Sequence, residues 1–262
     1  MAEGPLAKEL PALKIARMLA TAAATAALLT PLTAHAAPAT GGDSASPDIA
    51  GGTTTTISAA PYAAQISFDS TGTNVGCTGS QISANWVITA KHCNSTSLKS
   101  VRLGTTYLET GGTVKTVAAR YASSTGDVLL LKLSTPHYGS YVGLSSSFPA
   151  TGASAKVYGW GDQTEGAGTM SYYLKTANVT VAGQGVDTYG GPSVRTQSQT
   201  GHTLGGDSGG PLIVNGKLVG VLSTSSILPP QNPSDYTRYY NDHASIPSNL
   251  SWITSVSGVA GS

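Results

Sequence analysis

The chain has 262 residues, with 14 Lys and Arg against 13 Asp and Glu, so its formal net charge is +1. Charge this sparse and balanced, without a basic block, makes nucleic acid and anionic membranes poor candidate partners. The 32 glycines and the abundance of Thr and Ser disfavour long helices. We therefore expect an all-β fold, in a chain long enough to bury a substantial core.

Residues 1–36 are predicted to be a secretory signal peptide. Three basic residues within the first 17 precede an apolar run from residue 18 to about 32, and a small-x-small cleavage site follows at 34–36. The alternative, an amphipathic helix of the mature protein, conflicts with the prolines at 31 and 38. Residues 37–48 are small, polar and rich in Pro and Gly, which indicates a pro-segment. We expect residues 49–262 to be the mature, secreted domain, without a membrane span.

The chain has two cysteines, Cys77 and Cys93. In an exported protein the default interpretation is a disulfide, worth about 3 kcal/mol for a loop of this length. A structural metal site would need four ligands, so we expect neither a metal nor a cofactor.

Strand-like runs bounded by turn residues indicate a sandwich or a barrel. The Asn-Gly pair at 215–216 predicts a two-residue hairpin turn. Only the tail has helical spacing, over residues 249–256. The predicted strands are 63–68, 81–89, 114–119, 128–133, 155–158, 177–181 and 212–223.

The strongest chemical signal is the run Gly-Gly-Asp-Ser-Gly-Gly-Pro at 205–211. Glycines on both sides of Ser208 allow a tight turn that exposes the hydroxyl and frees backbone N–H groups for an oxyanion. By itself the run could also be an ordinary glycine-rich turn. A serine nucleophile needs a base to take its proton, and the base needs a carboxylate to hold its tautomer.

His92 and Asp127 fit these two roles. His92 ends an apolar run and is followed directly by Cys93, so a rigid element would hold its side chain. Asp127 heads an apolar strand, where an unpaired acid would be costly. The other acids and histidines considered are assigned to loop or surface positions: Asp69, Asp162, Asp187, His137 and His243.

With these motifs in order, the chain resembles the secreted bacterial trypsin-like (chymotrypsin-fold) serine proteases over residues 49–262. The motifs are Ile-Ala-Gly-Gly at 49–52, Thr-Ala-Lys-His-Cys at 89–93, Asp-Val-Leu-Leu-Leu at 127–131, Tyr-Gly-Trp-Gly at 158–161, the Ser208 run and Ser-Trp-Ile at 251–253. The chain order His, Asp, Ser is that of this family and differs from that of the α/β-hydrolases.

The resemblance implies two packed six-stranded antiparallel β-barrels with a C-terminal helix and the catalytic triad in the cleft between them. It implies an oxyanion hole from the amides of Gly206 and Ser208. It also implies activation by cleavage before Ile49, whose new amino group would pair with Asp207. The protein would then be a zymogen that a further protease activates, or that processes itself.

The same resemblance assigns His202, Ser223, Ser225 and Ser234 to the substrate pocket, with Ser223 also supporting the catalytic acid. Trypsins carry an aspartate where this chain has His202, so we expect a specificity other than ordinary Arg or Lys cleavage. Two interpretations of His202 stay open. Partly protonated, it could favour an acidic side chain, consistent with cleavage after Asp48; or it could merely pack while another protease removes Asp48.

Departures from the family pattern include Lys91 before the histidine, Leu204 in place of a cysteine, and Thr105-Thr106 where trypsins bind calcium. No calcium is therefore expected at that loop. The sequence predicts a monomeric serine endopeptidase acting on proteins or peptides. Two alternatives stay open: an exported esterase, because a triad and oxyanion hole serve any acyl transfer, and a non-catalytic binding homologue.

Overall fold

The computed structural model describes residues 49–229, 231–232 and 234–262. The predicted signal peptide, pro-segment and cleavage site at residues 1–48 lie outside the described residues. The elements are β1 Thr53–Thr54, β2 Ala63–Ser67, β3 Val75–Ser83, β4 Trp86–Thr89, η1 Lys91–Cys93, β5 Ser100–Leu103, β6 Thr113–Ala122, β7 Leu129–Leu133, β8 Gly143–Leu144, β9 Ser154–Gly159, β10 Lys175–Val186, β11 Pro192–Ser198, β12 Pro211–Val214, β13 Lys217–Ile227, η2 Tyr236–Arg238, β14 Tyr239–Ser245 and α1 Ile246–Ser257.

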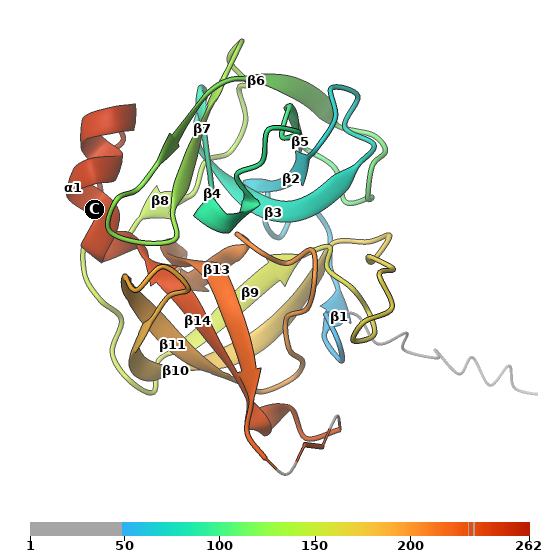
Figure 1. Cartoon of the computed structure of the whole chain (residues 1–262), viewed down its shortest axis with the longest axis vertical. Helices are drawn as coiled ribbons and strands as arrows, with labels where there is room; N and C mark the ends of the chain where they lie inside the picture. Colours follow the sequence, from blue (N-terminus) through green and yellow to red (C-terminus); the bar gives the residue numbers. More distant parts are fainter. Residues whose placement is uncertain (1–48, 230, 233) are drawn as a thin grey trace, which may run out of the picture. The chain divides into compact units, whose positions relative to one another are not determined.

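Two closed antiparallel barrels of six strands form the molecule, as predicted (Figure 1). The first barrel runs in the order β2-β3-β4-β7-β6-β5 and closes through pairing of β5 with β2. The second runs β9-β10-β11-β14-β13-β12 and closes through pairing of β12 with β9. Short strands β1 and β8 add to β10 and β13. Closure leaves neither barrel with an open edge around its circumference.

Each barrel has its own apolar core. Alternate residues of β2, β4, β5 and β7 fill the first barrel with Ala, Ile, Val and Leu side chains. Valines and alanines of β9, β10, β11 and β12 fill the second, together with the fully buried Ile49. A third apolar cluster lies under α1 and contains residues of both barrels, so hydrophobic burial couples the two.

The C-terminal helix α1 has a defined start and stop. The Ser245 hydroxyl accepts a hydrogen bond from Ser248 N at 3.2 Å, which caps the N-terminus. Gly258 ends the helix in the left-handed region with φ 75°. Ile246 and Ile253 lie on its buried face. The helix therefore begins three residues before the predicted range, and its Leu250, Ile253 and Val256 pack in the cluster shared by the two barrels.

Several strands differ from their predicted limits. The single predicted run 81–89 is two strands, the end of β3 and β4, joined by a turn at Ala84 and Asn85. The run 212–223 is likewise β12 and β13, and the predicted hairpin turn between them is confirmed, with Asn215 at φ 48° and Gly216 at φ 76°. Strands β5, β11 and β14 are missing from the prediction: β5 has only four residues, and the polar residues of β11 and β14 give no clear alternation.

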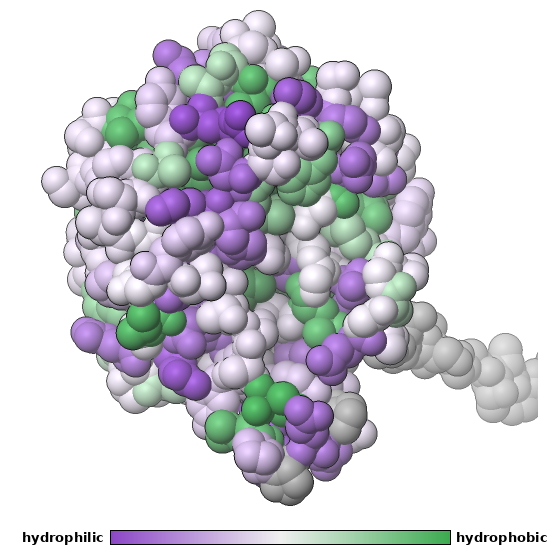
Figure 2. Space-filling model, viewed as in Figure 1, coloured by the Kyte–Doolittle hydropathy of each residue, from purple (hydrophilic) through white to green (hydrophobic). Residues whose placement is uncertain are grey.

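No helix among the described residues has both the length and the apolar character needed to cross a bilayer. Figure 2 shows hydrophilic and hydrophobic residues interspersed over the face seen there.

Candidate active site

The predicted base and acid are in direct contact. Asp127 precedes β7, and His92 lies in the short helix η1 that follows β4, the strand paired with β7. Asp127 Oδ2 lies 2.7 Å from His92 Nδ1, and Asp127 Oδ1 accepts a hydrogen bond from His92 N at 2.8 Å. The carboxylate thus holds both the backbone and the ring of the histidine, leaving Nε2 to accept a proton.

Asp127 is fully buried, and its surroundings favour the charged form. Burial alone would raise the pKa of this carboxyl, but hydrogen bonds from His92 and Ser223 and the charge of His92 outweigh burial and lower the pKa below its usual value. The hydrogen bond from Ser223 is consistent with the supporting role that the resemblance implied for this residue, which stays a prediction. The acid stays ionised wherever the histidine works as a base.

Ser208 lies just before β12 of the second barrel, and its backbone contacts the first barrel. Its carbonyl accepts a hydrogen bond from Thr78 N at 2.9 Å and lies 3.8 Å from Cys93 Sγ, one residue from the base. No hydrogen bond joins Ser208 Oγ to His92 in the described part of the chain; bonds of this kind often tighten only when substrate binds. Gly209 follows at φ 77°, and a Cβ there would lie 2.0 Å from Thr89 Oγ1, so only glycine fits this crossing between barrels.

The predicted oxyanion donors are available. Among the described residues, the amides of Gly206 and Ser208 have no hydrogen-bond acceptor, whereas the carbonyl of Gly206 is turned away and accepts from Thr78 Oγ1 at 3.0 Å. Gly206 has φ 91°, a conformation that glycine adopts without strain. Two free amides beside a serine hydroxyl can stabilise a developing oxyanion.

The predicted disulfide is present. Cys77 in β3 and Cys93 in η1 are bonded, with their Cα atoms 6.4 Å apart. Because Cys93 follows His92, the bridge ties the base to the wall of the first barrel.

A cavity of about 450 Å³ opens beside Ser208. Ser223 and Ser225 are among the residues that line it, with Thr203, Leu204, Gly205, Asp162 and Glu165. The polar wall is ordered by an asparagine that the sequence did not reveal: Asn241 Oδ1 accepts from Thr203 Oγ1 at 2.8 Å and from Ser225 Oγ at 2.9 Å.

Two predicted pocket residues lie elsewhere. His202 lines a separate cavity of about 270 Å³ with Ala50, Gly51 and Tyr236, and its ring stacks on Tyr239 with centroids 3.6 Å apart. Burial lowers the pKa of His202 to about 4, so the ring is neutral at pH 7 and cannot supply the positive charge proposed to attract an acidic side chain. Ser234 is exposed in the connection between β13 and β14.

Asp207 lies in a closed polar site. Its Oδ1 accepts from Gly161 N at 2.8 Å and its Oδ2 from Leu204 N at 3.0 Å. Cβ atoms on Gly159 or Gly161 would come within 2.3 Å of this carboxyl, so the two glycines make room for it. Burial raises the pKa of Asp207 to about 7. Among the described residues, no cation pairs with it.

One acid that the sequence analysis assigned to a loop contacts the site. Asp187 is only 4% exposed, and its Oδ2 accepts a hydrogen bond from the backbone N of Asp127 at 2.8 Å. The signal available in the sequence was its place just before Gly190 and Gly191, where an aspartate commonly bonds the amides of its own turn.

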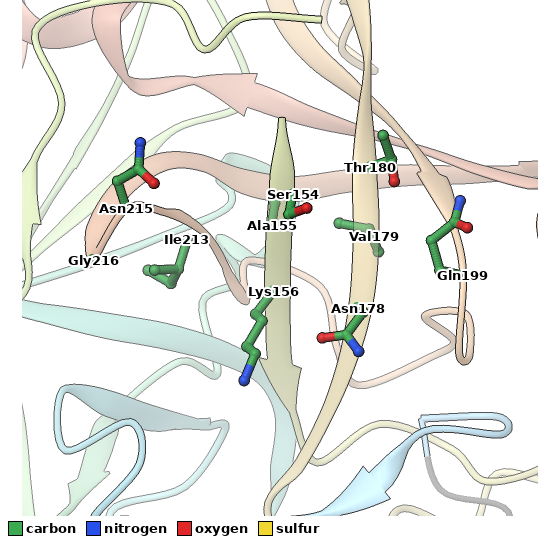
Figure 3. A pocket seen from close by; sticks show the side chains of 10 residues that line it. All are labelled: Ser154, Ala155, Lys156, Asn178, Val179, Thr180, Gln199, Ile213, Asn215 and Gly216. Carbon is green, nitrogen blue, oxygen red and sulfur yellow. The ribbon is translucent and has the colours of Figure 1, made fainter. Parts of the chain in front are cut away.

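Elsewhere, a larger cavity of about 520 Å³ lies across β9, β10 and β12, with the side chains of Lys156 and Asn178 pointing to the same side (Figure 3). None of the predicted site residues line it. Within the described part of the chain, no group of three or more His, Cys, Asp or Glu side chains could hold a metal.

Comparison with known proteins gives a consistent result. The family model described as Trypsin matches residues 49–246. Trypsin alpha of Drosophila melanogaster is 35% identical over 230 residues, covering 79% of this chain and 86% of its own. Trypsin alpha-4 of Lucilia cuprina is 36% identical over 198 residues, covering 67% and 76%. These relatives are insect proteins and do not support the expected bacterial origin.

Solved structures agree on the fold. The mouse brain serine protease neuropsin superposes with a TM-score of 0.61 at 26% identity, covering 75% of this chain and 94% of its own. Human heparin binding protein superposes with a TM-score of 0.66 at 24% identity, covering 80% and 97%, a likeness that concerns the fold alone.

Proposed function

Because the chain belongs to the trypsin family of serine proteases, we propose that it is an exported endopeptidase, activated by cleavage before Ile49, with a specificity other than ordinary Arg or Lys cleavage. The observation that carries the catalytic assignment is the 2.7 Å contact of His92 Nδ1 with the buried Asp127. The amides of Gly206 and Ser208, which have no acceptor among the described residues, support it. The expected bacterial origin is not part of the proposal.

The geometry supports two-step acyl transfer. His92 Nε2 takes the proton of Ser208 Oγ, which attacks the carbonyl carbon, and the amides of Gly206 and Ser208 receive the charge on its oxygen. His92 then protonates the leaving amine as the carbon–nitrogen bond breaks, which leaves the acyl-enzyme. Water enters and gives a proton to His92 as its oxygen attacks the acyl carbon. His92 returns this proton to Ser208 Oγ as the ester bond breaks and the acid is released.

Cleavage before Ile49 is supported by the state of Asp207. A fully buried carboxyl that has two amide donors, and no cation beside it in the described part of the chain, is costly to ionise, and a new amino group would compensate its charge. Gly206, whose amide is an oxyanion donor, precedes this acid directly. Formation of the pair would therefore hold the donor in place.

One wall of the proposed substrate pocket is polar and uncharged. Thr203, Ser225 and Asn241 bond one another there, and none of the three is a buried acid that could attract Lys or Arg. Asp162 and Glu165 on the same cavity would repel an acidic side chain and attract a basic one, so the proposed departure from Arg or Lys cleavage rests on the lack of an aspartate at position 202. An acidic preference is accordingly not proposed.

The catalytic assignment is tested with protein that begins at Ile49. A fluorophosphonate probe should label it, turnover of a peptide library should report the preference, and matched amide and ester substrates should both be cleaved. Ser208→Ala should abolish labelling and turnover, whereas Ser255→Ala, on the exposed face of α1, should retain both. Labelling of Ser208→Ala would refute the nucleophile, and cleavage of esters alone would refute the peptidase.

Activation is tested separately. A chain that begins at Ile49 and one that begins at Ala37 should differ strongly in turnover per molecule. The Ala37 chain carries Asp48→Ala to prevent self-processing after that residue. Equal turnover by both chains would refute the proposed ion pair while leaving the catalytic assignment intact.

A further inference from the structure

The tip of the β10–β11 hairpin, residues 187–191, lies against the head of β7, where the catalytic acid is held. The Asp187 carboxylate accepts hydrogen bonds from three backbone amides: Oδ2 from Asp127 N at 2.8 Å, and Oδ1 from Tyr189 N and Gly191 N at 2.9 Å each. One oxygen therefore organises the hairpin tip, while the other holds the catalytic residue. Charge-assisted bonds of this kind are short and strong.

The bond to Asp127 N acts on the part of the residue that sets its side chain. Aspartate has only two side-chain torsions, so a displaced backbone moves the carboxylate oxygens that His92 N and Nδ1 contact at 2.8 and 2.7 Å. Small displacements of catalytic groups have large effects on rate. Asp187 is therefore joined by one hydrogen bond to Asp127, the residue that orients His92.

The next residue of the hairpin acts on the second support of the acid. Thr188 N donates to Ser223 Oγ at 3.1 Å. With its oxygen occupied by this donor, the Ser223 hydroxyl is directed to donate to Asp127, the bond that helps to lower the pKa of that acid. Two consecutive hairpin residues therefore hold both the acid and the hydroxyl that supports it.

Glycines permit this close approach. A Cβ on Gly191 would lie 2.2 Å from Thr125 O and 2.6 Å from Gly126 Cα, and a Cβ on Gly126 would lie 2.7 Å from Asp187 Oδ2. Neither glycine has a positive φ, so the requirement is for space.

Lys91, the unusual residue before the base, also contacts the hairpin. Its ammonium lies 4.3 Å from the centre of the Tyr189 ring and donates to Ser123 O at 3.0 Å. The hairpin tip therefore touches the segments that carry both the base and the acid.

We propose that the hairpin tip 187–191 is a positioning element of the active site, in which the Asp187 carboxylate holds the backbone of Asp127 and the Thr188 amide orients Ser223. The inference rests on the proposed function. It makes Asp187 a positioning residue that acts through Asp127, rather than an aspartate that only closes its own turn.

The test is Asp187→Asn in protein that begins at Ile49. In asparagine an NH2 group replaces one carboxylate oxygen and would face a backbone N–H that the aspartate accepts from. Either the bond from Asp127 N or the bonds from Tyr189 N and Gly191 N must therefore be lost. With an amide substrate whose acylation limits turnover, kcat should fall at least about 10-fold, while KM stays within about 2-fold because no substrate contact is removed. Rates are expressed per site titrated with the fluorophosphonate.

Asp69→Asn is the matched control. Asp69 also accepts backbone amides within its own turn, from Thr71, Gly72 and Thr73, but touches no catalytic residue. The control should keep wild-type kcat. An equal loss of kcat in both variants would overturn the proposal, because a general effect of losing a turn carboxylate would then explain the result.

A double-mutant comparison separates positioning from fold support. If Asp187 acts through the catalytic carboxylate, adding Asp187→Asn to Asp127→Asn should change kcat by less than about 3-fold. Losses that multiply in the double variant, or a single variant with kcat within 2-fold of wild type, would overturn the proposal. Absence of turnover by the wild type would instead refute the proposed function.

Should Asp187→Asn give no folded protein, Gly191→Ala tests the same contact by pushing the hairpin from the head of β7. Gly143→Ala is its control, because the nearest atom to a Cβ there is 4.0 Å away. A loss of kcat in Gly191→Ala alone supports the proposal, and equal kcat in the two variants overturns it.

Discussion

Asp207 should make the stability of the uncut chain depend on pH in an unusual direction. Its folded-state pKa is about 7, raised by burial, whereas the unfolded chain should titrate near 3.9. Between these values the folded protein keeps the proton that the unfolded chain has lost. Stability from this group is therefore fully present below about pH 4 and is lost as pH rises through 7.

Linkage gives the magnitude. With these two pKa values, the free energy of unfolding should fall by about 2.5 kcal/mol between pH 5 and pH 8 through this group alone. The perturbation is Asp207→Asn, made in a Ser208→Ala chain that begins at Ala37 so that it stays uncut. Because asparagine does not titrate, this part of the pH dependence should disappear.

The assay is urea unfolding at pH 5 and pH 8, comparing the pH-induced change in the variant with that in its parent. Taking the difference removes the contributions of histidines, which are common to both. Asp69→Asn is the control and should match the parent, because the pKa of Asp69 is lowered and it titrates outside this range. Identical pH dependence in parent and Asp207→Asn would refute the reasoning. A chain that begins at Ile49 should lose the dependence as well, since its amino group would pair with the ionised acid.

Three further changes have clear expectations. Replacing Cys77 and Cys93 together by Ala should lower the free energy of unfolding by about 3 kcal/mol in denaturant titration, and an unchanged midpoint would show that the bridge adds nothing. Gly209→Ala should be destabilising by more than 1 kcal/mol and should lower the yield of titratable sites, since a Cβ would lie 2.0 Å from the first barrel at a positive φ. Ser223→Ala removes a hydrogen bond that lowers the pKa of Asp127, so kcat should fall several-fold with little change in global stability; wild-type kcat would contradict the supporting role.

The sequence alone predicted the fold and the chemistry where both are encoded locally. The glycines around Ser208 allow the turn that exposes the hydroxyl and the amides. The Asn-Gly pair at 215–216 forms the hairpin turn between β12 and β13. His92 and Asp127 could be paired because each stands at the end of an apolar run that must become a buried strand. These features depend on backbone conformation and on the alternation of residues, which are readable from neighbours in the chain.

Only the tertiary structure decided which distant residues share a site. Asp187 lies 60 positions from the acid it contacts, and Asn241 meets Thr203 and Ser225 because β14 pairs with β13 at a register that a long connection leaves open. Ser234 is exposed in the connection between these strands. Burial of His202 lowers its pKa to about 4 and leaves the ring neutral at pH 7. Barrel closure and hydrogen bonding between strands set these contacts, and both depend on the whole chain.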